Sequence, residues 1–495
     1  MKDCEGLPFW PVHWGVTAAL LACLAVYLSG TAPWLVMDGP NPDDWRQMAG
    51  APAGGMPLNW TTEEGRWAMD LIFVYLFGER FLTPLQVALA FPCFFWIAHC
   101  LAGRAAPHDL EAPATVLIFA FGLNHIYMVD ALNFSSHVFP YPLALVLSLT
   151  AFSLMEFERG LWWRLPLAAQ MLAISAGIYQ PFAIFGIVLP LLALMRTDRY
   201  SVGVALRFIL FGILAGVLGL FLYFLEWQVL VSIDPHTAEV NRIGSMGSRE
   251  LIAKLPALPN LWQSMHTGGL QNVPFALRLV HLALVATIAL GVGFAMVNTM
   301  QRSRTTLAMT MARIGVAPVA ILFVVPTLIW FTYPSTWMPG RVVGYLGFFV
   351  SGVAVCVLAL LPTRVRLFGF IALAGTASIY LFVASAAWHD QVRTGDLDRE
   401  LARAILARVS GMQGYDGQPI RLIGEVPSPN SWGGLLGWRV FHEGNPVPGI
   451  FREMYGFGWD AESLLVSPRP CPAFPAYDAV FMHQGRAHVC LSKVE

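Results

Sequence analysis

Long apolar runs separated by short polar connections occupy most of this chain. Because an α-helix needs roughly 20 apolar residues to cross the hydrocarbon core of a bilayer, each such run predicts a membrane span. The pattern therefore predicts an α-helical polytopic membrane protein with about eleven transmembrane helices. The predicted spans are residues 12–30, 82–102, 113–131, 138–156, 165–179, 181–195, 205–231, 274–298, 314–332, 341–361 and 366–388.

Two segments of this pattern are less regular. The runs 165–179 and 181–195 are short and are separated by Tyr179-Gln180-Pro181, which is compatible with two short helices or with one broken helix. Segment 67–77 is too short to span comfortably, and we expect it to lie along the membrane interface. The charged leader before the first run lacks a small-residue cleavage site, so that run is expected to remain as an anchor.

The pattern changes after residue 388. Residues 389–410 have apolar positions at helical spacing among charges, residues 421–426 predict a short strand, and residues 476–492 are typical of a closing hairpin. We therefore divide the chain into a transmembrane domain, 1–388, and a small α/β domain, 389–495. Cys471 and Cys490 in the second domain are compatible with a disulfide or with two unpaired core residues.

Composition narrows the classes of function. The chain has 495 residues, of which 56% are hydrophobic, and its 30 basic residues are balanced by 31 acidic ones. This balance offers no basic excess for nucleic acid, and the apolar content is too high for soluble domains. The seven cysteines form no metal-binding spacing. No cofactor is therefore predicted; a divalent metal held by acidic residues of the first loop is the alternative, and it is not favoured.

Basic side chains are concentrated in alternate connections between the predicted spans. They crowd the short connections on one side and are spread thinly over longer loops on the other. The positive-inside bias predicts a cytoplasmic N-terminus, with residues 31–67 and 389–495 on the outer side. The predicted inner set includes Arg104, Arg196, Arg199 and Arg313.

The first outer loop, residues 31–67, gathers carboxylates and tryptophans in a chain that is only 12% charged. Asp43 and Asp44 form a candidate acid/base pair, because like charges held close raise one carboxyl pKa toward the range useful for proton abstraction. The alternative is a solvated turn or a helix cap. Trp45 is expected to sink into the membrane interface and to draw Asp44 with it, so Asp44 is the favoured base and Asp43 its support.

Two arginines lie at predicted outer boundaries of the membrane. Arg66 follows a glycine in the sequence GRW, and Arg341 ends the sequence WMPGR. Each is compatible with an interfacial anchor whose charged end reaches water. The functional alternative is capture of a phosphate, because a guanidinium matches phosphate oxygens with two parallel donors. Two arginines that face a carboxylate loop favour a lipid phosphate as the ligand.

Further polar residues occur at the outer ends of other spans. Ionisable groups at membrane depth usually face a water-filled cavity or one another. Several of them at one depth and on one side predict a single outward-facing cavity, whereas each histidine taken singly is compatible with a packing role. The predicted cavity residues are Asp38, Trp45, His137, Tyr179, Gln180 and Glu226.

Several short motifs then occur in an order that resembles a known family. They are Asp43-Asp44-Trp45, Gly65-Arg66-Trp67, Gly177-Ile178-Tyr179-Gln180, a Pro-Gly-Arg that ends at Arg341, and an RLIG strand near the C-terminus. As an ordered set they resemble the O-antigen serotype-converting glucosyltransferase family of C-type membrane glycosyltransferases. Between the third and fourth spans, where that family commonly has an Arg/Asp-containing stretch, this chain has NFSSHVFPYP.

The resemblance implies a C-type glycosyltransferase bundle in the bacterial inner membrane, with a periplasmic active site that modifies lipopolysaccharide. The donor would be a polyprenyl-phosphate sugar, the acceptor a glycan, and no cofactor or nucleic acid would take part. Asp44 or Asp43 would deprotonate the acceptor hydroxyl. Arg341 and Arg66 would hold the departing phosphate, and the anomeric configuration would invert.

A transporter or flippase for a polyprenyl-linked sugar or lipid is the rival hypothesis. Such folds often show repeated halves and broken helices near the middle of the bilayer. The sequence shows no internal repeat, and its polar residues gather on one side. A structural membrane protein whose outer domain binds partners is a third alternative, which leaves the acidic loop without a role.

Overall fold

The computed structural model describes most of the predicted spans and much of the C-terminal domain. Asp38, Asp43, Asp44 and Trp45 lie outside the described residues, so their predicted roles stay predictions. The described residues are 14–36, 65–77, 83–134, 137–156, 160–196, 199–233, 252–267, 275–303, 307–332, 339–426, 441, 450–451, 454, 461–464 and 467–494.

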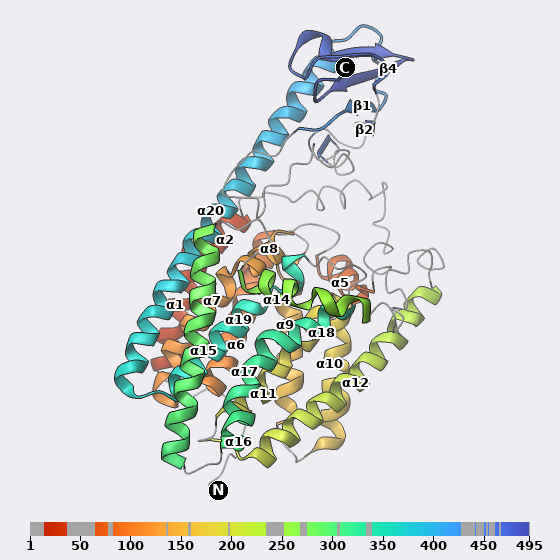
Figure 1. Cartoon of the computed structure of the whole chain (residues 1–495). Helices are drawn as coiled ribbons and strands as arrows, with labels where there is room; N and C mark the ends of the chain where they lie inside the picture. The colour runs from red at the N-terminus through yellow and green to blue at the C-terminus, as the bar shows by residue number, and fades with distance from the viewer. Residues whose placement is uncertain are drawn as a thin grey trace.

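A bundle of long apolar helices forms most of the described structure (Figure 1). Seven helical stretches in the described ranges are long and apolar enough to cross a membrane, and eight if a pair bent by 62° is one span. The bundle helices are α1 (Trp14–Ser29), α2 (Thr31–Val36), α5 (Trp67–Leu71), α6 (Thr83–Ala105), α7 (Glu111–Asn124), α8 (Ile126–Leu132), α9 (Pro140–Leu154), α10 (Leu161–Tyr179), α11 (Val188–Met195), α12 (Val202–Ile233), α14 (Leu258–Thr267), α15 (Phe275–Ser303), α16 (Leu307–Thr310), α17 (Val316–Val319), α18 (Val325–Thr332), α19 (Leu346–Ala359) and α20 (Thr363–Ser410).

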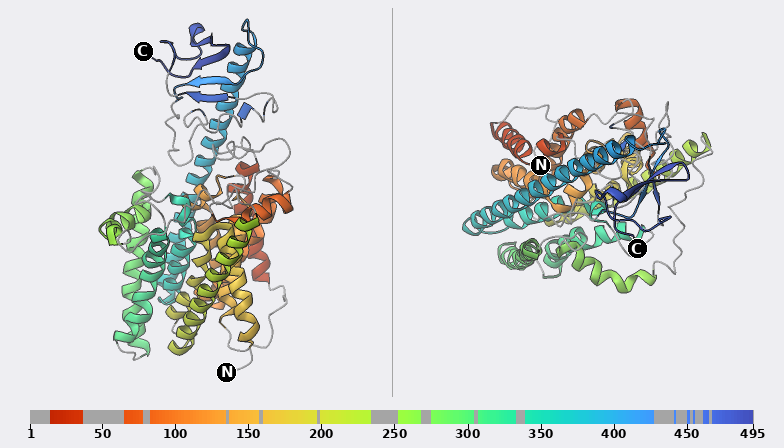
Figure 2. Two further views of the ribbon diagram at one scale, coloured as in Figure 1. Left: turned by 90° about the vertical axis from the view of Figure 1, so that its right-hand side faces the viewer. Right: turned by 90° about the horizontal axis from the view of Figure 1, so that it is seen from above.

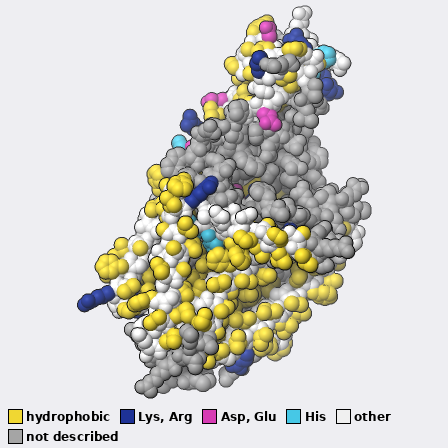
Figure 3. All heavy atoms as spheres, viewed as in Figure 1, with side chains coloured by type: hydrophobic (Ala, Val, Ile, Leu, Met, Phe, Trp, Pro, Cys, Tyr) yellow, Lys and Arg dark blue, Asp and Glu magenta, His cyan; other side chains and the backbone are white. Residues whose placement is uncertain are grey.

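Hydrophobic side chains cover the outside of this bundle. Figure 3 shows them over α12, α15 and α17, below the part of the molecule that carries most of the charged side chains. Leu210 on α12 and Phe294 on α15 are more than half exposed, at 63% and 52%. Apolar side chains in such numbers are stable only against lipid. The predicted class, a multi-pass helical membrane protein, is confirmed.

The chain reverses direction at Tyr179, between α10 and α11. Tyr179 has an extended backbone, and the 3₁₀ segment Gln180–Ile187 joins the two helices. α10 begins shortly after Glu156, which accepts a hydrogen bond from Arg104 at the end of α6. α11 ends beside Arg196, which donates to the Ala105 carbonyl at that same end of α6. Since both helices meet the same end of α6, the structure favours two short helices over one broken helix.

Arginines gather where these helices end, and we call this region the basic end of the bundle. It is defined by Arg104, Arg196, Arg199 and Arg313. Arg104 bonds to Glu156 at 2.7 Å, and Arg199 donates to the Gly103 carbonyl at 2.8 Å. Arg313 donates to the Leu194 carbonyl at 2.9 Å. The basic connections that the charge pattern predicted on the inner side of the membrane therefore lie together at one end of the bundle.

The 48-residue helix α20 leaves the opposite end of the bundle and reaches the C-terminal sheet, as both side views show (Figures 1 and 2). The predicted domain boundary at residue 388 falls inside this helix. Trp388 belongs to the core of the membrane bundle, and Ala402 begins the core of the C-terminal domain. In that second core, Ile405 and Val409 of α20 pack with Ile420 and other buried residues of the sheet.

The C-terminal sheet has the strand order β2-β1-β4-β3. Its strands are β1 (Ile420–Ile423), β2 (Ala461–Leu464), β3 (Val480–His483) and β4 (Arg486–Cys490). β1 pairs in parallel with β2 and with β4, whereas β3 and β4 are antiparallel. Gln484 and Gly485 have positive φ angles and form the two-residue turn between β3 and β4. The predicted strand and closing hairpin are confirmed.

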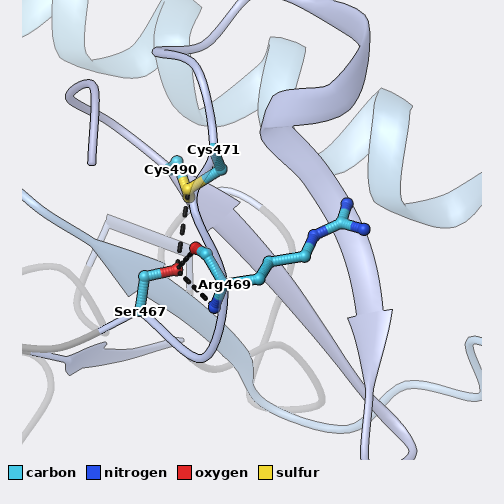
Figure 4. The surroundings of a disulfide bond; sticks show 4 residues. All are labelled: Ser467, Arg469, Cys471 and Cys490. Atoms are coloured by element: carbon cyan, nitrogen blue, oxygen red, sulfur yellow. Dashed lines mark hydrogen bonds between the residues drawn. A yellow bond between two sulfur atoms is a disulfide. The ribbon is translucent and has the colours of Figure 1, made fainter. Parts of the chain in front are cut away.

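A disulfide joins Cys471 to Cys490 at the end of β4 (Figure 4). Cys471 and Val494 exchange two backbone hydrogen bonds of 3.1 and 3.0 Å, and the Phe474 N–H donates to the Cys490 carbonyl at 2.7 Å, so the segment that carries Cys471 lies beside the end of the chain that carries its partner. The Ser467 hydroxyl lies 3.6 Å from the Cys471 sulfur. Of the two alternatives that the sequence allowed, the structure contains the disulfide, which is consistent with an extracytoplasmic location of this domain.

Candidate functional site

The motifs Gly65-Arg66-Trp67 and Gly177-Ile178-Tyr179-Gln180 lie against each other at the start of α5. Gly65 has a φ of 78°, which favours glycine, and it turns the chain into α5. Trp67 packs directly on Gly177, where an added Cβ would lie 2.6 Å from the indole. The Arg66 guanidinium carbon lies 4.9 Å from the centre of the Tyr179 ring. Glycine at residue 177 thus permits the contact between the two motifs.

Arg341 approaches the same region from the 3₁₀ helix Gly340–Val343. Its backbone N–H donates to a carboxylate oxygen of Asp130 on α8 at 2.7 Å, and Asp130 is 6% exposed. The Arg341 guanidinium carbon lies 4.9 Å from the centre of the Phe134 ring. Asp130 therefore fixes the backbone of the arginine while the side chain extends over an aromatic face.

Four aromatic rings connect the two arginines, and we call them the aromatic stack. The ring centres of Phe134 and His137 are 4.8 Å apart, those of His137 and Tyr141 4.3 Å, and those of Tyr141 and Tyr179 4.5 Å. His137 and Tyr141 are nearly parallel, with 10° between their planes. Arg341 lies over the Phe134 end and Arg66 over the Tyr179 end. The stack consists of Phe134, His137, Tyr141 and Tyr179.

His137 occupies the middle of this arrangement. Its side chain is 3% exposed, and neither ring nitrogen has a hydrogen-bond partner among the residues that the structure describes. Burial, and then the positive charges of Arg66 and Arg341, lower the pKa of His137 well below its ordinary value. The imidazole is therefore neutral at neutral pH and lies within electrostatic reach of both guanidinium groups.

Gln180 and Glu226 extend the site toward α12. Gln180 donates to the Tyr223 hydroxyl at 3.1 Å, and Arg66 lies within electrostatic reach of that hydroxyl. Glu226 is three residues further along α12, on the same face as Tyr223. It accepts a hydrogen bond of 2.6 Å from Gln170 on α10. Gln180 directly follows Tyr179, over which Arg66 lies. Glu226 is connected to this region through its neighbour Tyr223 on α12.

The structure gathers the described residues that the sequence assigned to one site. Arg66, Arg341, His137 and Tyr179 meet at the aromatic stack, with Gln180 beside them. Sequence reasoning missed Phe134 and Tyr141 as members of the stack. The spacing of four residues from His137 to Tyr141 is typical of one face of a helix. It could have indicated that Tyr141 lies beside His137.

A second buried polar cluster consists of His125, His266, His281 and Tyr380. His281 on α15 hydrogen bonds to the Tyr380 hydroxyl on α20, and the His125 ring lies 5.3 Å from that of Tyr380. His266 on α14 contacts the Leu322 carbonyl at 3.1 Å. In the described ranges no group of three or more histidine, cysteine or acidic residues is arranged to hold a metal ion. This cluster joins α14, α15 and α20 at the core of the bundle.

The site around the aromatic stack has the chemistry of an anion site. Two guanidinium groups offer planar sets of donors that match phosphate oxygens, and the neutral imidazole between them can donate one further hydrogen bond. Aromatic faces hold the guanidinium groups in place through cation–π contact. Comparison with protein-family models, with curated proteins and with solved structures finds no match to this chain.

Proposed function

We propose that this protein is an inverting membrane glycosyltransferase. It moves a glucose-like hexose from a polyprenyl-phosphate donor to a glycan or lipid-linked acceptor of the cell envelope, at the periplasmic face of a bacterial inner membrane. The observation that carries the proposal is the placement of Arg66 and Arg341 at the two ends of one buried aromatic stack. The resemblance of the motifs to C-type membrane glycosyltransferases agrees with it.

The phosphate of the donor would lie between the two arginines. α5 and α8 lie at the end of the bundle from which α20 leaves, so a headgroup here would sit at the membrane surface (Figure 1). The prenyl chain would extend along the apolar exterior of the bundle. Charge-assisted hydrogen bonds from two guanidinium groups stabilise the negative charge that develops on the departing phosphate.

The acceptor hydroxyl would need a base, which we assign to Asp44 with Asp43 as its support. As Asp44 removes the hydroxyl proton, the acceptor oxygen forms a bond to the anomeric carbon. The bond from that carbon to the phosphate oxygen breaks, and the oxygen keeps the electron pair. Attack from the face opposite the phosphate inverts the anomeric configuration.

The test is transfer of labelled sugar by the purified protein from a polyprenyl-phosphate sugar to an envelope glycan. We expect transfer by the unaltered protein, and a loss of about 10²–10⁴-fold in Asp44→Asn, because a general base contributes that much to the rate. Asp43→Asn should lose less. Both variants must match the unaltered protein in thermal stability. Normal turnover in both would remove the first outer loop from the chemistry.

A flippase for the same lipid is the second candidate, because the helical segments His108–Asn124 and Ile126–Leu132 are bent by 62° relative to each other, as in a broken span or a re-entrant loop. Broken helices are common in transporters. Movement of the labelled lipid across vesicle membranes, with no transfer to acceptor, would favour this candidate and exclude the transferase.

A further inference from the structure

We infer that α14 is an acid-sensitive latch, which is released from the bundle when His266 takes up a proton. Through Tyr127 and Asp130 of α8, the docked latch also positions Arg341. This second step rests on the proposed function, in which Arg341 binds the phosphate of the donor. The release of α14 by acid does not rest on it.

α14 lies at the end of the bundle from which α20 leaves (Figure 1). Its buried face includes Met265 and His266. Two polar contacts attach it to the neighbouring segment: the Trp262 indole donates to the Thr327 hydroxyl at 2.8 Å, and the His266 ring nitrogen Nε2 contacts the Leu322 carbonyl at 3.1 Å. The docking of this helix therefore depends in part on the state of one histidine.

His266 meets the bundle inside a group of buried histidines. Its ring centre lies 6.0 Å from that of His281, which lies 5.4 Å from that of His125. All three side chains are at most 5% exposed. Each ring also has one nitrogen without a hydrogen-bond partner among the described residues, which is Nδ1 in His266 and Nε2 in the other two. A proton on His266 would thus place a charge in a buried site that offers it no new partner, which is unfavourable.

The charges around His266 do not compensate such a proton. In the part of the chain that the structure describes, no carboxylate pairs with a histidine of this cluster. Asp130 on α8 accepts the backbone N–H of Arg341 instead. Residues 320–332, which contact His266 at Leu322, include no charged side chain. The other ionisable groups of the cluster and of the described segments beside it are His125, Tyr127, Lys254, Arg278, His281 and Tyr380, and none of them is a carboxylate.

The pKa of His266 follows from this environment. Burial lowers it from its ordinary value of 6.5 to about 4, and the contact with the Leu322 carbonyl opposes part of this shift. A released histidine regains its ordinary pKa, so the contribution of the neutral ring to docking is complete above about pH 6.5 and is lost as the pH falls toward 4. Between pH 7 and pH 5, His266 alone should shift the equilibrium toward released α14 by roughly 20-fold.

The latch reaches the arginine site through α8. The Tyr127 hydroxyl lies 3.0 Å from the carbonyl oxygens of Ser264 and Met265 on α14, to which it donates. Asp130, about one turn further along α8, accepts the Arg341 backbone N–H at 2.7 Å. Since α8 has only seven residues, the loss of its contact with α14 should loosen the turn that holds Arg341. Release of α14 should therefore weaken the binding of a phosphate.

The test is hydrogen–deuterium exchange of the α14 amides in the purified full-length protein at pH 7 and pH 5, corrected for the intrinsic exchange rate at each pH. In the unaltered protein, the protection of α14 should fall roughly 20-fold or more, while the buried helix α19 keeps its protection. In His266→Gln, whose amide can still donate to the Leu322 carbonyl, the fall should be roughly 20-fold smaller. The control His108→Gln changes a histidine that is 88% exposed and should behave as the unaltered protein does.

An equal fall in the unaltered protein and in His266→Gln would overturn the inference. If His266→Gln does not fold, the unaltered protein alone decides. Unchanged protection of α14 between pH 7 and pH 5 would then contradict the latch.

Binding of farnesyl phosphate tests the connection to Arg341. The two proteins are compared at the same pH, so that the charge of the phosphate is the same for both. At pH 5 the unaltered protein should bind up to about 20-fold more weakly than His266→Gln, and at pH 7 the two should bind alike. Equal affinities at pH 5 would overturn the connection. Failure of both proteins to bind at pH 7 would contradict the proposed function, whereas the exchange measurement decides the latch without it.

Discussion

The two ends of the bundle use arginine in different ways. At the basic end, Arg196 donates to the Ala105 carbonyl and Arg313 to the Leu194 carbonyl, so the guanidinium groups bind helix ends. At the end from which α20 leaves, Arg66 and Arg341 lie over the faces of aromatic rings. Stacking holds a guanidinium without using the donors in its plane, which are the donors that match phosphate.

The difference separates structural arginines from candidate binding arginines. A buried carbonyl at the end of a helix needs a donor, and an arginine that supplies one contributes to folding. Arg66 and Arg341 lie over aromatic rings beside the neutral His137, which makes them the candidate binding arginines. Three substitutions test this contrast.

The largest effect is expected from Arg341→Ala. Loss of a charge-assisted hydrogen bond worth about 1.5–3 kcal/mol should weaken use of the lipid donor by roughly 10–150-fold. Use of the acceptor should change less. Arg341→Lys should restore part of the loss, because lysine keeps the charge but lacks the planar donors. Donor titrations with purified variants measure the effect, and Arg199→Ala at the basic end is the control. Unchanged donor affinity in Arg341→Ala would make this arginine an anchor.

Arg196→Ala should give the opposite result. Arg196 is 2% exposed and donates to the carbonyls of Ala105 and Arg104. Each buried carbonyl that loses its donor costs about 1–3 kcal/mol, so the free energy of unfolding should fall. Donor affinity of the folded protein should stay unchanged. Thermal unfolding in detergent, followed by donor titration below the transition, measures both. A variant that keeps its stability but loses donor affinity would contradict the division between the two ends.

The smallest effect is expected from Gly177→Ala. A new methyl group would meet the Trp67 indole at 2.6 Å, and overpacking of this kind costs about 1–3 kcal/mol. Because Trp67 is adjacent to Arg66, donor affinity should fall together with stability. The matched control is Gly216→Ala on α12, where an added Cβ meets nothing within 4 Å. Equal unfolding temperatures and donor affinities in the two variants would show that the Trp67–Gly177 contact does not position Arg66.

Much of the fold follows from local sequence. The spans were predicted within a few residues for most helices, for example 82–102 against Thr83–Ala105 and 205–231 against Val202–Ile233. Bilayer thickness sets the length of an apolar helix, so hydrophobicity alone locates it. The hairpin of β3 and β4 was predicted because alternating apolar residues flank a short turn that contains Gly485.

The candidate site was only partly predictable. Arg66, Arg341 and Tyr179 were assigned to one site from their residue types and their expected depth in the membrane. The aromatic stack was not predicted, because the contact between Tyr141 and Tyr179 depends on how α9 packs against α10. The lowered pKa of His137 also depends on tertiary structure, because it comes from burial and then from two arginines that are distant in sequence.

By itself, the sequence determined that this protein is a multi-pass helical membrane protein with a small C-terminal domain, because hydrophobic length and alternation act locally. Only the tertiary structure decided that Cys471 bonds to Cys490. It also decided that the chain reverses at Tyr179 and that His137 lies between two arginines. Each of these features depends on how segments that are far apart in the chain pack against each other. The distance between two such segments in space does not follow from the number of residues between them.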